Sequence, residues 1–106
     1  DLCTIAWNAY AVMALPGSEL YKKAYEKSYD LPENYDGYSF YSYYTKPLPT
    51  SELSPVQILK FRDEAFTKYH THKTFLKKIK QNYGDVAVKN INNMTSIKLK
   101  RFILGD

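Results

Sequence analysis

The sequence contains a single cysteine, Cys3, among its 106 residues. One cysteine cannot form a disulfide within the chain, and together with only two histidines it cannot complete a four-ligand structural zinc site. It also cannot hold an iron–sulfur cluster, which needs several thiolates. The cysteine count therefore indicates neither an oxidising compartment nor a metal centre, and we predict that this chain binds no cofactor.

Long apolar runs are also missing. The apolar segment from Leu2 to Leu15 is interrupted by Thr4 and Asn8, and it is shorter than the roughly 20 residues that span a bilayer. The chain begins with Asp1 and shows no basic leader, so we expect no signal peptide. These features predict a cytoplasmic protein that does not enter a membrane.

Recognisable catalytic constellations are absent as well. The sequence has no glycine-rich phosphate loop and no clear arrangement of serine, histidine and acid. His70 and His72 could share a metal in a strand-like segment, but we interpret them as solvent-exposed turn residues at a helix end. Arg62 and Asp63 lie within an apolar helical pattern, where we expect Arg62 to brace a neighbouring segment. We therefore expect no enzymatic activity of the isolated chain.

Aromatic residues, in contrast, are abundant: the chain has 11 tyrosines, five phenylalanines and one tryptophan. Each buried aromatic side chain removes about 150–250 Å² from water, so these residues can hold together a chain with room for one modest core. The net charge is +4, and from Lys73 to Arg101 the only acid is Asp85. We interpret this basic third as a solvated helix surface, with nucleic acid or an acidic protein surface as alternative partners.

The segment before Pro16 alternates apolar residues with others. Its apolar set has a period of two and predicts a strand with one buried face: Cys3, Ile5, Trp7, Ala9, Ala11, Met13 and Leu15. The alanines also permit a helix, and Pro16-Gly17 ends the element in either case. A lone strand exposes unpaired backbone groups, so we predict a homo-oligomer held through residues 1–15.

Ser18 can cap a helix over residues 19–29. From Asp30 to Glu52, helix breakers prevent regular structure: Pro32, Gly37, Pro47 and Pro49. The same stretch is rich in aromatic residues: Tyr35, Tyr38, Phe40, Tyr41, Tyr43 and Tyr44. Such a composition favours an ordered coil packed over another part of the protein rather than a flexible linker.

Helix signals are clearest in the C-terminal half. Ser54 and Gln57 predict a capping box at the start of a helix over residues 55–69. A second helix over residues 74–83 would stop at Gly84, and a third over residues 86–104 would be capped by Asp85. Helical spacing places six side chains in a shared core: Leu59, Phe66, Leu76, Ile79, Ile91 and Phe102.

These patterns predict a mainly α fold with a minor β contribution. We divide the chain into a strand-like segment (residues 1–17), a helix followed by an aromatic-rich ordered coil (residues 18–53), and a helical domain of three helices (residues 54–106). On the residues alone, the fold class is that of a mostly helical accessory domain.

Several phrases occur in the same order as in a known family. They are Met13-Ala14-Leu15-Pro16-Gly17-Ser18-Glu19-Leu20-Tyr21, Leu31-Pro32 with Gly37-Tyr38-Ser39, Pro47-Leu48-Pro49-Thr50 with Leu53-Ser54, Phe61-Arg62-Asp63-Glu64-Ala65-Phe66, and Met94 with Leu99-Lys100-Arg101. They resemble "MAYPGS.LY", "LP..w.gYSQ", "PLPT..LS...vl.FRDeAF" and "M....LKR" of radical SAM proteins that carry a cobalamin-binding domain. Leu15 replaces the usual aromatic residue, and Phe40 stands where glutamine is usual. The phrases cover almost the whole chain.

The resemblance implies a parent enzyme of the iron–sulfur oxidoreductase or methyltransferase type. Such a parent has an N-terminal cobalamin domain, a partial (β/α) barrel with a 4Fe-4S cluster, and a C-terminal region like this chain. Residues 1–17 would be a remnant of the last barrel strand. The family's cluster motif, CxxxCxxC, has no counterpart here, so the sites for the cluster, S-adenosylmethionine and cobalamin would lie upstream. The partner of this chain would be the rest of the parent enzyme.

The resemblance also implies a role for the tyrosine-rich coil, as a cover that excludes water from a radical intermediate and shapes the substrate pocket. The candidates for the substrate side are Trp7, Asn8, Tyr10, Tyr38 and Ser39. The alternative function is a small basic helical module that binds nucleic acid or another protein. We do not expect nucleic acid as the partner, because the family phrases lie in the coil and the helix caps rather than on the basic surface.

Overall fold

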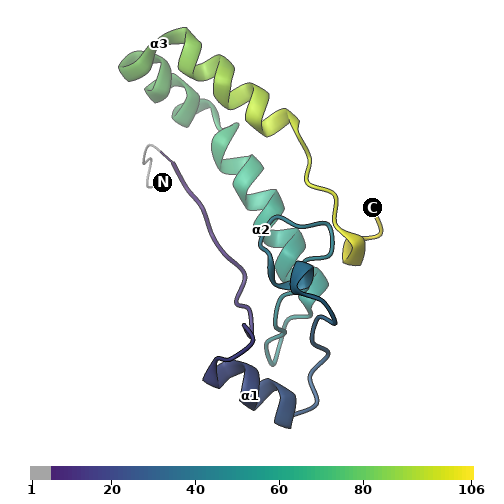
Figure 1. Cartoon of the computed structure of the whole chain (residues 1–106). Helices are drawn as coiled ribbons and strands as arrows, with labels where there is room; N and C mark the ends of the chain where they lie inside the picture. The colour runs from purple at the N-terminus through teal and green to yellow at the C-terminus, as the bar shows by residue number, and fades with distance from the viewer. Residues whose placement is uncertain (1–5) are drawn as a thin grey trace. The chain divides into compact units, whose positions relative to one another are not determined.

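The computed structural model describes residues 6–106. Its elements are α1 (Glu19–Glu26), the 3₁₀ turn η1 (Tyr35–Tyr38), α2 (Pro55–His70), α3 (Lys73–Ser96) and the 3₁₀ turn η2 (Phe102–Leu104) (Figure 1). The fold is mainly helical, as predicted, and no β-strand occurs within residues 6–106. In the same range no helix is both long and apolar enough to cross a membrane.

The chain forms two compact units. The coil unit consists of Tyr10–Arg62 and Leu99–Asp106, and the helical unit consists of residues 6–9 and Asp63–Lys98. The boundary between them falls within α2. Buried apolar side chains in the coil unit are Met13, Ala14, Ala24, Pro47 and Leu59, and those in the helical unit are Phe75 and Ile79.

The predicted N-terminal strand is wrong for residues 6–15, which have no regular secondary structure, and Cys3 and Ile5 lie outside the described residues. The backbone N–H of Leu48 donates to the carbonyl of Val12 at 2.9 Å, which is how a ladder would begin. The donors that would continue it are used elsewhere, because Lys46 N–H bonds to the Gly37 carbonyl and Thr50 N–H to that of Leu53. The pairing therefore stops after one bond.

The period of two nevertheless survives as a pattern of exposure. The odd-numbered positions are half-buried or buried, namely Trp7, Ala9, Ala11 and Met13, whereas the even-numbered Asn8, Tyr10 and Val12 are exposed. Leu15 departs from the pattern because it is exposed, while its neighbour Ala14 is buried. The alternation thus identified a face of the segment but not its secondary structure. The homo-oligomer through residues 1–15 stays a prediction.

Local capping fixes the helix starts in the coil unit. The Ser18 hydroxyl accepts a hydrogen bond from the Tyr21 N–H at 3.1 Å, and this begins α1 as predicted. The predicted end is wrong by three residues, because Ser28 has a φ of 58° and the Tyr29 N–H returns to the Ala24 carbonyl.

The predicted capping box at the start of α2 is confirmed. The Ser54 N–H donates to the Gln57 side-chain oxygen at 2.9 Å, and the Gln57 N–H donates to the Ser54 hydroxyl at 3.2 Å. The helix then runs to His70, one residue beyond the prediction.

Gly84 breaks α3 as predicted. Its φ of 85° and ψ of −178° belong to a region that is essentially restricted to glycine, and the ribbon changes direction sharply at this point (Figure 1). The helix begins earlier than expected, at Lys73, because the ring of His72 accepts a hydrogen bond from the Thr74 N–H at 3.2 Å. A histidine as N-cap was not predicted.

The predicted third helix over residues 86–104 is wrong in its last part, because α3 ends at Ser96. The hydroxyls of Thr95 and Ser96 donate to the carbonyls of Ile91 and Asn93, and such local bonds compete with the helical ladder.

Of the six predicted core side chains, Leu59 and Ile79 are buried, Phe66, Leu76 and Ile91 are half-buried, and Phe102 is 60% exposed.

Candidate functional site

The tyrosine-rich coil is organised around one buried cation, the guanidinium of Arg101. The Arg101 side chain has 0% exposure, and its Nη1 donates to the carbonyls of Phe40 at 2.9 Å and Ser42 at 3.0 Å. The same nitrogen donates to the hydroxyl of Thr45, itself fully buried, at 3.0 Å. A guanidinium suits this position because its rigid fork can serve several acceptors without leaving any buried donor unpaired.

The backbone on either side of Arg101 is bound to the coil unit as well. The Arg101 N–H donates to a side-chain oxygen of Asp106 at 3.1 Å, and the Phe102 N–H donates to the Tyr43 carbonyl at 2.8 Å. The Tyr43 hydroxyl returns to the backbone oxygen of Asp106 at 2.8 Å. Residues 99–106, of which 99–104 were predicted as the end of a helix, are therefore a strap that is hydrogen-bonded across the coil.

Exposed aromatic rings lie beside this strap. The ring centroid of Phe102 is 5.9 Å from those of both Tyr43 and Tyr44, and the two tyrosine rings are 5.1 Å apart. These three rings are 37–60% exposed. They form an aromatic cluster on the surface of the coil unit rather than part of its core.

Tyr10 belongs to a second aromatic group in the coil unit. Its ring lies 4.6 Å from that of Phe40 and 6.4 Å from that of Tyr41. A hydrogen bond with the Tyr41 side chain, together with the charge of Tyr41 and some burial, raises the pKa of Tyr10, and the Arg62 cation opposes this. The guanidinium carbon of the buried Arg62 lies 5.4 Å from the Tyr41 ring centroid, so Arg62 braces the coil as predicted.

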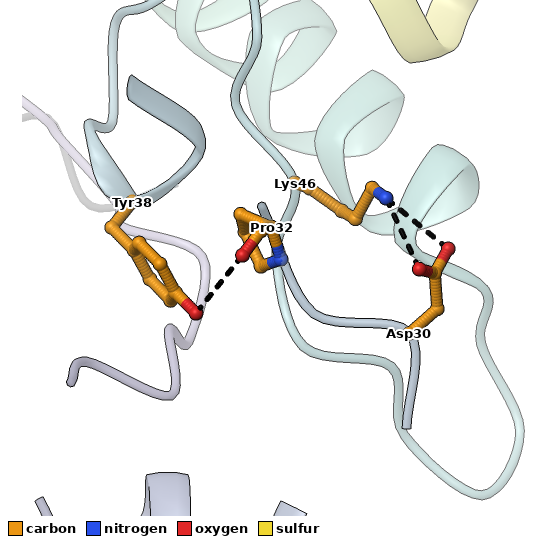
Figure 2. A network of polar contacts seen from close by, with 4 residues as sticks. All are labelled: Asp30, Pro32, Tyr38 and Lys46. Atoms are coloured by element: carbon orange, nitrogen blue, oxygen red, sulfur yellow. Dashed lines mark hydrogen bonds and ion pairs between the residues drawn. The ribbon is translucent and has the colours of Figure 1, made fainter. Parts of the chain in front are cut away.

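Tyr38 and Ser39 lie at the end of η1. The Tyr38 hydroxyl donates to the Pro32 carbonyl at 3.5 Å, while Lys46 nearby forms an ion pair with Asp30 at 3.2 Å (Figure 2). Burial, and to a smaller extent the charge of Tyr21, raises the pKa of Tyr38. Ser39 is exposed, and its carbonyl accepts a hydrogen bond from the Thr45 hydroxyl.

Trp7 and Asn8, the other two candidates for the substrate side, belong to the helical unit. Trp7 is half-buried, and its ring stacks on Tyr69 with centroids 6.3 Å apart. Asn8 is exposed, and its side-chain oxygen accepts a hydrogen bond from the Ala9 N–H at 2.9 Å. The structure thus brings Tyr10, Tyr38 and Ser39 into one unit and Trp7 and Asn8 into the other.

The expectation that His70 and His72 are both exposed turn residues is correct for His72 and wrong for His70. His70 is only 3% exposed and is the last residue of α2. It lies four residues after Phe66, and the two rings are 4.3 Å apart. Extending the helical period from Phe66 by one more turn would have indicated its burial.

Residues 6–106 include no group of three or more His, Cys, Asp or Glu side chains placed to hold a metal ion. Comparison of the chain with protein-family models, curated proteins and solved structures gives no match.

Proposed function

We propose that this chain is a non-catalytic C-terminal region of a cobalamin-dependent radical SAM enzyme, where it covers the barrel on the substrate side. The carrying observation is that one hydrogen-bond network joins phrases that are remote in sequence. Arg101, from the closing phrase, donates to the carbonyl of Phe40, which directly follows the Gly37-Tyr38-Ser39 phrase. Separate pieces of the resemblance thus support one local structure.

The network also accounts for the main departure from the family pattern. Phe40 stands where the family has glutamine, but Arg101 uses the backbone carbonyl of this residue and not its side chain. The side chain at position 40 can therefore differ without loss of the hydrogen bond from Arg101. In this chain the Phe40 ring packs on Tyr10 instead.

Within such a cover, Tyr10 and Tyr38 would provide uncharged phenols. The pKa of each is raised, so both hydroxyls keep their protons at neutral pH. Because the Tyr38 hydroxyl donates to Pro32 and Tyr10 is hydrogen-bonded to Tyr41, each phenol oxygen would accept a hydrogen bond from a polar group of a substrate and orient it, while the surrounding rings exclude water. The chemistry of radical formation would belong to the cluster, S-adenosylmethionine and cobalamin bound elsewhere in the parent.

The test is to determine the complete reading frame that encodes residues 1–106 and to express both the frame and this chain. After anaerobic reconstitution with iron and sulfide, the product of the frame should show sulfur-to-iron charge-transfer absorption and cleave S-adenosylmethionine to 5′-deoxyadenosine. Residues 1–106 alone should do neither. A reading frame without CxxxCxxC, or a stoichiometric cluster on residues 1–106, would contradict the proposal.

A second candidate, a nucleic-acid-binding module, is favoured by one observation in the helical unit. Four lysines on the first half of α3 are exposed, namely Lys73, Lys77, Lys78 and Lys80. Lys73, Lys77 and Lys80 recur at helical spacing. Of these, Lys80 forms an ion pair with Asp85 at 3.4 Å. Binding to single-stranded nucleic acid that weakens steeply with salt would favour this candidate over the first.

A further inference from the structure

His70 lies at the centre of the aromatic core of the helical unit. Its ring centroid is 4.3 Å from that of Phe66, 5.2 Å from that of Tyr69 and 5.4 Å from that of Phe75. The imidazole is 3% exposed, and Trp7 extends the group by stacking on Tyr69. One titratable ring is thus enclosed by aromatic side chains of α2 and α3 and adjoins the N-terminal segment.

Both ring nitrogens of His70 have hydrogen-bond partners, and these partners define the tautomer. Nδ1 lies 2.8 Å from the Phe66 carbonyl, which can only accept, so Nδ1 carries the hydrogen. Nε2 receives the backbone N–H of Trp7 at 3.4 Å, so it must present its lone pair. The contacts therefore require a neutral imidazole.

We propose that His70 is an acid-sensitive latch that holds residues 6–9 on the helical unit when it is neutral and releases them when it is protonated. A proton on Nε2 would place one N–H donor against another, that of Trp7. The hydrogen bond would be lost, and a cation would remain in an aromatic enclosure with no acceptor for its second N–H. Moving the N-terminal segment away relieves both costs, because water can then reach Nε2.

The ring groups that contact His70 from the packed elements supply no negative charge and no hydrogen-bond acceptor for its second N–H. The ring contacts from α2 and α3 are Phe66, Tyr69 and Phe75, of which only Tyr69 is titratable, and residues 6–9 contribute no ionisable side chain. The charged residues closest to His70 in sequence are Lys68 on α2 and Lys73 on α3, followed by Glu64, Asp63 and Lys77; all are exposed except Asp63, which is half-buried. The two closest, Lys68 and Lys73, are cations and would oppose a second positive charge rather than stabilise it.

The chain has one tryptophan and two histidines, so the NMR signals of Trp7 and His70 can be followed individually. In the 106-residue chain labelled with [¹⁵N]tryptophan, the backbone amide of Trp7 gives a single NMR signal. Its protection from hydrogen exchange is measured from pH 8 to pH 5, relative to the intrinsic rate at each pH. Protection should fall by about tenfold, the factor given by one ordinary hydrogen bond. The fall should follow the change in the chemical shift of the His70 ring.

Two variants separate the latch from general acid effects. In His70→Gln, which cannot gain the proton, Trp7 protection should not change with pH. In His72→Asn, which keeps a side chain able to cap α3, the transition should be unchanged. If His70→Gln fails to fold, the unmodified chain still decides, because the ring signals of its two histidines are followed separately. Trp7 protection that stays constant while His70 is protonated, or a His70 ring that stays neutral to pH 5, would overturn the proposal. This inference is independent of the proposed parent enzyme.

Discussion

The guanidinium of Arg101 donates to the hydroxyl of Thr45 at 3.0 Å, and both side chains are completely shielded from solvent. The two residues are 56 positions apart in the sequence. Thr45 in turn lies within hydrogen-bond distance of the carbonyls of Ser39 and Ser42. A segment with few regular elements thereby acquires a defined structure from a single polar centre.

Replacing Arg101 should therefore destabilise the coil unit more than an ordinary substitution on the surface does. In Arg101→Lys, the ammonium on its flexible stem ends about one bond short of Nη1, the nitrogen that reaches Phe40, Ser42 and Thr45, so we expect a loss of about 2–4 kcal/mol in the free energy of unfolding. Urea denaturation followed by circular dichroism measures it. The exposed neighbour is the control, and Lys100→Ala should change stability by less than about 0.5 kcal/mol. Equal effects of the two substitutions would show that Arg101 is not the centre of the coil.

Thr45 can be tested with a pair of near-isosteric substitutions. Thr45→Val removes the hydroxyl but keeps the shape, and it leaves a buried donor of Arg101 without one acceptor, so we expect a loss of about 1–3 kcal/mol. Thr45→Ser keeps the hydroxyl and should lose less. Combining each with Arg101→Lys in a double-mutant cycle should show coupling for valine and little for serine. If Thr45→Val is as stable as the unmodified chain, the hydroxyl contributes only to packing.

The parts of the fold that could be predicted from the sequence are those determined by interactions between residues only a few positions apart. Ser18 at α1, the box of Ser54 and Gln57 at α2, and Gly84 within α3 each act on a backbone group no more than three positions away. The residues that determine these helix starts and the break are therefore all visible in a short stretch of sequence.

The two largest failures have the opposite property, since each depends on a partner that is remote in sequence. The strand over residues 6–15 needed a neighbour, but the backbone of residues 46–50 is bonded to Gly37 and Leu53. The last helix was extended through Arg101, whose acceptors lie in the coil around Phe40 and Thr45. Of the five candidates for the substrate side, none could be paired with its neighbours from spacing alone, and their role stays a prediction.

Gly37 provides a steric test of the same coil. It is buried, and a Cβ at this position would lie 2.2 Å from Cβ of Pro32 and 2.8 Å from its Cγ. Gly37→Ala should therefore displace the Leu31-Pro32 turn and cost about 1–3 kcal/mol of stability, as overpacking does. The exposed Ser39, in the same turn, is the matched control, and Ser39→Ala should remain within about 0.5 kcal/mol of the unmodified chain. A neutral Gly37→Ala would mean that Gly37 and Pro32 are not in contact in solution.

Tyr38 should make the stability of the coil unit fall at alkaline pH. Burial raises its pKa above the ordinary value of 10.0, so folding favours the protonated phenol. The stabilisation that the Tyr38 phenol contributes is fully present below the pKa of the unfolded phenol and is lost as the pH rises through the higher pKa of the folded one. The free energy of unfolding of the unmodified chain should accordingly decline above about pH 10.

The measurement is urea denaturation at a series of pH values from 8 to 11, with Tyr38→Phe beside the unmodified chain. The variant should show a shallower decline, because it has no proton to lose at this position, and at pH 8 it should be only slightly less stable, since the hydroxyl makes one long hydrogen bond of 3.5 Å to Pro32. Tyr35→Phe, which removes a phenol that is 82% exposed, is the control and should follow the unmodified chain. Parallel declines for Tyr38→Phe and the unmodified chain would place the Tyr38 hydroxyl in water, and the cover on the substrate side would then lose one of its two proposed uncharged phenols.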